Sequence, residues 1–227
     1  MTTQDRIVVV IAAFNEAKVI DGVVRALVAA GHAVVLVDDG SGDGTAEIAR
    51  KAGAEVIVHP VNLGQGAALQ TGIDVALQAG ADFIVTFDAD GQHRAADVAR
   101  LVAALKAANA DFALGNRFLG AAVQVTGTRN VLLKAATLFT RFTTGLDIHD
   151  THNGLRAMSR RGASHIRLRQ NRMAHASEIL HQIAVSQLPF VEVPVTIAYT
   201  DYSRAKGQRL VDFVAILIDL FVRRLQR

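Results

Sequence analysis

Short runs of β-branched and other apolar residues alternate with segments of helical periodicity through the first half of the chain, and this rhythm restricts the fold most. Runs that are apolar at every position predict strands buried on both faces, as in parallel sheets. Strands joined by helices favour an α/β fold with a mostly parallel central sheet flanked by helices. The predicted strands are Ile7–Ile11, Ala33–Val37, Glu55–Val58, Ala81–Phe87 and Phe112–Gly115.

Helices are predicted between these strands, at Ala17–Ala30, Gly44–Lys51 and Gly66–Ala79. A further helix is indicated by four apolar residues at the spacing i, i+3, i+4, i+7, which are Val98, Leu101, Val102 and Leu105. Beyond residue 116 the rhythm changes. There the predicted elements are helices at Thr128–Thr144, Ala174–Val185 and Val211–Arg224 and short strands at Leu155–Met158 and Val191–Ile197.

Composition and charge exclude several classes of protein. The 227 residues include no cysteine, which excludes a disulfide scaffold, a thiolate zinc site and a cysteine nucleophile. The net charge of +3 is unevenly spread: residues 1–150 carry 12 Lys and Arg against 16 Asp and Glu, whereas residues 151–227 carry 12 against 5. The N-terminus has no signal-peptide pattern, and Leu210–Leu225 contains two aspartates and would span a bilayer poorly. We therefore expect a cytoplasmic protein.

The loops after the predicted strands carry polar and small residues suited to chemistry. Ligands of open α/β sheets bind beyond the carboxyl ends of the strands. Asp88 and Asp90 follow one strand directly, and hard oxygen ligands of this kind suit Mg²⁺ or Mn²⁺ held together with a phosphate group. Just beyond them, Gln92 and His93 either lie in a solvated loop or bind the metal or a phosphate.

The order of these loop segments resembles family-2 glycosyltransferases of the GT-A type, most closely the dolichyl-phosphate mannose synthase branch. The resemblance covers residues 7–207. It rests on Ile11–Glu16, Val37–Ser41, Asn62–Ala68, Phe87–His93 and Gly115–Phe118. Two later segments, Asp150–Arg156 and Tyr199–Gln208, are similar to the family's acceptor segment and to its flexible basic loop.

The resemblance implies a metal-dependent, inverting transfer of a sugar from a nucleoside-diphosphate sugar, assisted by Mg²⁺ or Mn²⁺. It implies metal ligands at Asp88, Asp90 and Gln92, with Asp90 and Arg117 in catalytic roles. The family has proline in place of Ala12 and lysine in place of Gln65. The residues implied for nucleotide-sugar binding are Ala12, Phe14, Glu16, Asp39, Gly64, Gln65, Asp88, Ala89, Arg204 and Lys206.

The second half of the chain is implied to bind the acceptor, through Arg117, Arg129 and Asn153. Two kinds of acceptor stay open at this point. A hydroxyl would need a general base, for which Asp150 is the candidate, whereas a polyprenyl phosphate is already anionic at neutral pH. A polyprenyl phosphate or another cell-envelope glycan acceptor is favoured, because the helices predicted at Thr128–Thr144 and Val211–Arg224 are strongly apolar. Such helices either contact the inner face of a membrane or are buried in the core or a homodimer interface.

We expect one glycosyltransferase domain over residues 1–227, because no linker rich in Ser, Gly or Pro divides the chain. Residues 1–117 would form the nucleotide-sugar and metal half, and residues 118–227 the acceptor half. The main alternative is a nucleotide-sugar-binding protein without catalysis, against which the intact acidic pair argues. No nucleic-acid binding is expected, because no series of aromatic residues accompanies the arginines.

Overall fold

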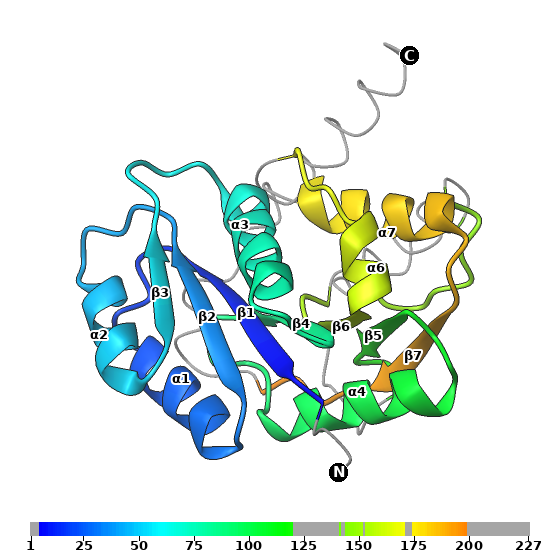
Figure 1. Cartoon of the computed structure of the whole chain (residues 1–227), viewed down its shortest axis with the longest axis horizontal. Helices are drawn as coiled ribbons and strands as arrows, with labels where there is room; N and C mark the ends of the chain where they lie inside the picture. Colours follow the sequence, from blue (N-terminus) through cyan, green and yellow to red (C-terminus); the bar gives the residue numbers. More distant parts are fainter. Residues whose placement is uncertain (1–4, 120–140, 142–143, 152, 171–173, 199–227) are drawn as a thin grey trace, which may run out of the picture.

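A computed structural model of the chain describes residues 5–119, 141, 144–151, 153–170 and 174–198 (Figure 1). Seven strands form one sheet in the order β3-β2-β1-β4-β6-β5-β7. The strands are β1 (Ile7–Ala13), β2 (Ala33–Asp38), β3 (Glu55–Val58), β4 (Phe83–Asp88), β5 (Phe112–Asn116), β6 (Arg156–Ser159) and β7 (Phe190–Pro194). The helices are α1 (Ile20–Ala29), α2 (Thr45–Ala52), α3 (Gln65–Gln78), α4 (Ala96–Ala107), α6 (Arg160–His165) and α7 (Ala174–Ser186).

The sheet is mostly parallel, as predicted. Six strands run in one direction, and β6 is antiparallel to both of its neighbours, β4 and β5. Sequence periodicity carries no information on the direction of a four-residue strand, so the reversal of β6 was not part of the prediction. Its consequence is local. The chain enters β6 beside the carboxyl end of β4, which brings residues from the second half of the chain to the loops of the first half.

Two layers of helices cover the sheet (Figure 1). Successive side chains of a strand point to opposite faces. Accordingly, Val9 and Ile11 pack with α1, α2 and α4, whereas Val8 and Val10 pack with α3, α6 and α7. Helix α3 lies so close to β1 that a Cβ atom on Gly72 would be 2.3 Å from Val10. Burial of each such side chain contributes about 1.5–3 kcal/mol, and together these contacts hold the ends of the strands in place.

The predicted helices and strands within the described residues are all present, with small shifts of their bounds. Helix α1 begins at Ile20 and not at Ala17, and the residues before it form a turn in which the N–H of Val19 bonds to the carbonyl oxygen of Glu16 (3.0 Å). Helix α6 was missed, since six residues show no periodicity. Its N-cap is Ser159, whose side chain accepts the N–H of Gly162 (3.0 Å). The helix predicted at 211–224 lies outside the described residues, as does all of 128–144 except 141 and 144.

Candidate active site

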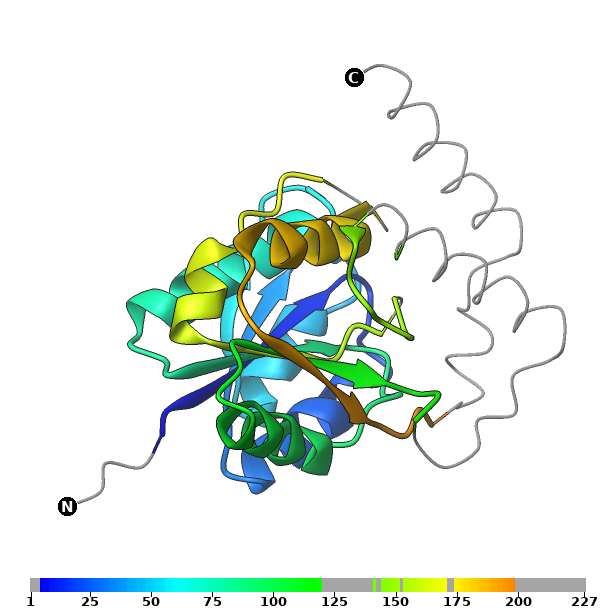
Figure 2. The same cartoon turned by 90° about the vertical axis from the view of Figure 1, so that its right-hand side faces the viewer.

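The loops singled out in the sequence meet at the carboxyl ends of the parallel strands. Strands β1, β2 and β4 are direct neighbours in the sheet, so the loops after them are neighbours too. Figure 2 shows β5 and β7 ending side by side at the same edge. This edge is where an open α/β sheet binds its ligands.

The loops after β1 and β2 are bonded to each other by side chains. The N–H of Asn15 bonds to Ser41 Oγ (2.8 Å), and Asn15 Oδ1 accepts the N–H of Gly42 (3.1 Å). The N–H of Glu16 bonds to Thr45 Oγ1 (2.8 Å), and the residue is buried. Beside them, the ring of Phe14 is half-exposed at the same edge. These bonds place two predicted nucleotide-binding residues, Phe14 and Glu16, on a loop held in a defined position.

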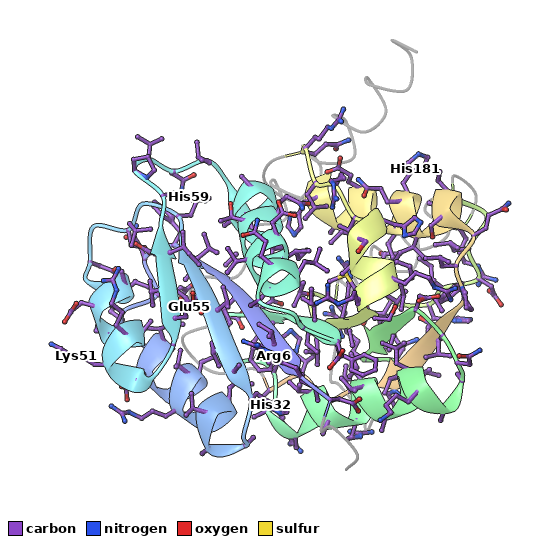
Figure 3. The ribbon with its side chains drawn as sticks, in the orientation of Figure 1. Arg6, His32, Lys51, Glu55, His59 and His181 are labelled. Carbon is purple, nitrogen blue, oxygen red and sulfur yellow. The ribbon has the colours of Figure 1, made fainter. Side chains whose placement is uncertain are left out.

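Asp39 is buried, and its carboxylate is fully engaged by the protein. Oδ1 accepts the N–H of Leu63 (2.9 Å) and lies 2.8 Å from Nδ1 of His59, while Oδ2 accepts the N–H of Gly64 (2.7 Å). The other ring nitrogen of His59 lies 3.1 Å from Thr71 Oγ1, and Figure 3 labels His59 at the end of β3. Asp39 therefore organises the loop that leads into α3.

Helix α3 begins at this organised loop. Gly64 precedes the helix with a φ of 97°, in the left-handed region that favours glycine, and Gln65 is the first helical residue. A Cβ atom on Gly66 would lie 2.1 Å from the carbonyl oxygen of Gln170 and 3.1 Å from Cβ of His175. The glycines of this segment thus permit close packing against the start of α7, and Gly64 and Gln65 lie at the ligand edge.

Asp88 is the last residue of β4 and lies beside Ala12 of β1 in the sheet register. Its Oδ2 bonds to Nε2 of His93 (2.9 Å), whose side chain is buried. Burial raises the pKa of Asp88, but the hydrogen bond and charge of His93 and the charges of Arg156 and His175 outweigh it and lower the pKa below its usual value. Asp88 is therefore ionised at neutral pH.

Asp90 stands in the opposite electrostatic situation. Burial and then the charge of Asp88, with a smaller effect of Glu16, raise its pKa above the usual value. Oδ1 of Asp90 accepts the N–H of Gln92 (3.0 Å), which shapes the loop. The two carboxylates are thus held near each other although their charges repel, with the buried Ala89 between them in sequence.

This acidic pair fits a hard divalent cation. Carboxylate oxygens are the ligands that Mg²⁺ and Mn²⁺ prefer, and a cation between Asp88 and Asp90 would remove their repulsion. In the part of the chain that the structure describes, no group of three or more Asp, Glu or His side chains could hold an ion by itself. The remaining ligands would come from Gln92, water and phosphate, which matches a metal shared with a diphosphate.

Asp150 and Arg117 form a buried ion pair at the same edge. Oδ2 of Asp150 accepts both the backbone N–H (3.0 Å) and Nε (2.7 Å) of Arg117, and the side chain of Asp150 is 1% exposed. The pair lies next to Asn116, whose side chain bonds to Glu192 of β7 (2.9 Å). The structure therefore places the predicted base and a predicted phosphate ligand together, with the carboxylate occupied by the arginine.

Asn153 and Gly154 come between this ion pair and β6. Oδ1 of Asn153 accepts the N–H of Leu155 (3.0 Å), and its buried Nδ2 has no hydrogen-bond partner among the described residues. A Cβ atom on Gly154 would lie 2.3 Å from both carboxylate oxygens of Asp88. This glycine therefore forms part of the site around Asp88, whereas the sequence had indicated a role at the acceptor end.

Arg156 closes the segment Asp150–Arg156 that resembles the family's acceptor segment, but the sequence analysis gave it no role of its own. It lies on β6, is buried, and donates from Nη2 to the carbonyl oxygen of Thr151 (3.4 Å). Burial lowers its pKa to about 10, while the charges of Asp88 and Asp150 act in the opposite direction. One signal was available: a lone charged residue between Leu155 and Ala157, in a run short enough to be a buried strand.

The remaining predicted residues, Arg129, Arg204 and Lys206, lie outside the described residues. The last described residue before the basic loop is nevertheless attached to the site, because the N–H of Ala198 bonds to the carbonyl oxygen of Gln92 (2.9 Å). None of the helices in the described ranges is long and apolar enough to cross a bilayer.

Comparison with known proteins identifies the family. Residues 8–167 match the family described as glycosyl transferase family 2. The chain belongs to this family. It is 31% identical to a UDP-N-acetylglucosamine–dolichyl-phosphate N-acetylglucosaminyltransferase of Methanococcus voltae, with 90% of each chain covered. It is also 36% identical to the polyprenol monophosphomannose synthase of Mycolicibacterium smegmatis over 135 residues, which are 56% of this chain and 51% of that protein.

Solved structures support the fold of this family-2 glycosyltransferase. Glucosyl-3-phosphoglycerate synthase from Mycobacterium tuberculosis, crystallised with Mn²⁺, uridine diphosphate and phosphoglyceric acid, superposes with a TM-score of 0.72 at 20% identity, covering 93% of this chain and 74% of that one. The same enzyme has been crystallised with Mg²⁺ and uridine diphosphate. The predicted GT-A type fold, the family and the glycosyltransferase activity are thus confirmed.

Proposed function

We propose that this glycosyltransferase moves a sugar from a nucleoside-diphosphate sugar to a polyprenyl phosphate, with inversion and with the help of Mg²⁺ or Mn²⁺. The observation that carries the proposal is the repelling pair Asp88 and Asp90 at the ligand edge, where burial and like charge raise the pKa of Asp90. A relative at 31% identity is named for transfer to dolichyl phosphate, and a structural neighbour was crystallised with Mn²⁺ and uridine diphosphate.

On the donor side, Asp88, Asp90 and Gln92 would hold the metal and, through it, the diphosphate. When bound, the cation would act as a Lewis acid that takes up charge on the departing diphosphate. The chain's own contribution is position: His93 holds the carboxylate of Asp88, and the Asp39 network holds the loop before α3. Phe14, Glu16 and the residues from Gly64 would contact the nucleoside.

On the acceptor side, the ion pair favours a phosphate over a hydroxyl. Asp150 is almost fully buried and receives two hydrogen bonds from Arg117, so it is poorly placed to take a proton from an incoming hydroxyl. A phosphate nucleophile has no proton to lose. The arginine is also followed by Phe118 (38% exposed) and Leu119 (55% exposed), apolar side chains suited to a polyprenyl chain. We assign Arg117 to the acceptor phosphate, oriented by Asp150.

The experiment compares two acceptors that differ only in the phosphate. The full chain is incubated with radiolabelled UDP- and GDP-sugars and Mn²⁺, and with either a polyprenyl phosphate or the corresponding polyprenol. We expect product with the phosphate and none with the alcohol. Product with the alcohol would instead make Asp150 the general base of a hydroxyl transferase.

A binding measurement accompanies the transfer assay. Thermal unfolding is followed with each donor, with and without Mn²⁺, because a ligand that binds the native state raises its stability. A donor-dependent shift without product from either acceptor would indicate the alternative, a binding protein without catalysis. The absence of both shift and product with every donor would contradict the proposal.

A further inference from the structure

Arg156 is a buried cation on the same face of the sheet as the acidic pair. In the register of the two antiparallel strands, Arg156 of β6 lies directly opposite Thr86 of β4. Directly opposed residues point to the same face, and so do residues two apart on one strand. Asp88 comes two residues after Thr86, so its side chain and that of Arg156 project from one face. The side chain of Thr86 further ties the strands together by donating to the carbonyl oxygen of Gly154 (2.7 Å).

The environment of Arg156 joins the donor site to the acceptor site. The residue is 5% exposed, and its Nη2 atom reaches the carbonyl oxygen of Thr151. The charges of Asp88 and Asp150 both act on it, although burial lowers its pKa to about 10. An arginine with this pKa is a full cation at neutral pH. Of these two carboxylates, Asp88 has the larger effect on Arg156.

A fixed cation beside a metal-binding carboxylate changes what the site can hold. The carboxylates attract a divalent ion, and the guanidinium repels it through a poorly screened interior, where charge interactions are several-fold stronger than in water. A bound diphosphate adds negative charge at the same place, so the net electrostatic effect on a divalent cation becomes attractive.

We propose that Arg156 weakens the binding of a free divalent cation to Asp88 and Asp90, so that the metal is held firmly only together with the diphosphate of the donor. Arg156 would thus be a positioning and tuning residue that couples metal binding to donor binding. The inference rests on the proposed function insofar as the donor is a nucleoside diphosphate. It assigns to β6 a role in the donor site, whereas the sequence analysis had placed the segment Asp150–Arg156 at the acceptor end.

The test uses the full chain with Arg156→Gln and Arg156→Lys. Glutamine is polar but neutral, whereas lysine retains the positive charge. Free Mn²⁺ is measured by its electron paramagnetic resonance signal at pH 8, without nucleotide and with UDP or GDP. Thermal unfolding of each variant provides the control for folding.

We expect Arg156→Gln to bind Mn²⁺ alone about tenfold more tightly than the wild type, and to lose a similar part of the enhancement by nucleotide. The affinity of Arg156→Lys for Mn²⁺ alone should remain within about threefold of the wild-type affinity. Lysine keeps the positive charge, and the larger effects of residues near a metal site come from changes in charge or in ligand orientation. A purely structural role would weaken Mn²⁺ binding in both variants, so tighter binding separates the two explanations.

Unchanged or weaker binding of Mn²⁺ alone by folded Arg156→Gln would overturn the inference. If that variant does not fold, the wild type and Arg156→Lys are compared. Equal affinity of the wild type for Mn²⁺ with and without nucleotide would overturn the inference. A large increase of Mn²⁺ affinity by nucleotide that is kept in Arg156→Lys would support it. Sugar transfer by the wild type is measured in parallel. If the wild type transfers sugar but Arg156→Gln binds Mn²⁺ alone no more tightly, only this inference is contradicted. If the wild type neither binds nucleotide nor transfers sugar, the proposed function is contradicted.

Discussion

Two acidic loops follow the strands on either side of β1, and the structure gives their carboxylates opposite environments. After β2, Asp39 accepts two backbone N–H groups and contacts His59, so the protein itself satisfies the carboxylate. After β4, Asp88 and Asp90 repel each other, and the pKa of Asp90 is raised by burial and by that repulsion. A satisfied carboxylate stabilises the fold. A carboxylate that is repelled by a neighbouring carboxylate still attracts a cation.

The largest effect is expected at Asp90. Asp90→Asn removes a carboxylate that we propose as a metal ligand and should lower sugar transfer at least about a hundredfold, because metal assistance supplies several kcal/mol of transition-state stabilisation. The same change relieves repulsion with Asp88, so the free energy of unfolding should stay equal or rise by about 0.5 kcal/mol. Transfer and urea unfolding are measured together. The exposed Asp21→Asn is the control, and transfer by Asp90→Asn within threefold of the wild type would contradict the assignment.

Asp39 should show the reverse pattern. Asp39→Ala leaves two backbone N–H groups and a buried histidine without their acceptor, which should lower the free energy of unfolding by about 2–4 kcal/mol. The affinity for Mn²⁺ should be unchanged in the folded protein, since the metal ligands lie on another loop. Urea unfolding and Mn²⁺ titration give both quantities. Thr71→Val, which removes only the outer partner of His59, should cost about 1 kcal/mol. If Asp39→Ala is as stable as the wild type, Asp39 does not stabilise the fold and the difference drawn between the two loops is wrong.

A smaller effect should follow from a methyl group placed against the acidic pair. In Gly154→Ala the new Cβ would lie 2.3 Å from both oxygens of Asp88, so the carboxylate has to move. We expect Mn²⁺ affinity in the presence of nucleotide to fall about tenfold. Gly22→Ala on α1, where a Cβ would meet nothing within 4 Å, is the matched control and should be neutral or slightly stabilising. Equal affinities in the two variants would show that β6 does not shape the metal site.

Several features of the site follow from local sequence. The strands of the first half were recognisable because they are mostly apolar, and Asp88, Asp90 and Gln92 stand at or just after the end of a parallel strand. The contrast between the acidic loops was not recognisable in the same way. Asp39 and Asp90 look alike in sequence, and only the three-dimensional neighbours of each carboxylate distinguish a satisfied group from a repelled one.

The role of the segment before β6 shows the same limit. Asn153, Gly154 and Arg156 were visible in the sequence, and they were placed with the acceptor because Asp150–Arg156 resembles the family's acceptor segment. The antiparallel entry of β6 beside β4 brings Gly154 and Arg156 to Asp88. Strand direction depends on packing between distant segments, so periodicity could not supply it.

The amino-acid sequence by itself determined the α/β architecture, the family and the loops at which we propose the site, because hydrophobic periodicity and loop composition are local properties. The tertiary structure decided which carboxylate is already satisfied, that Asp150 is paired with Arg117, and that a buried arginine from the second half of the chain projects from the same face of the sheet as Asp88. Those outcomes depend on how close residues far apart in sequence come to each other and on how deeply they are buried, because both quantities set the energy of interaction between charges.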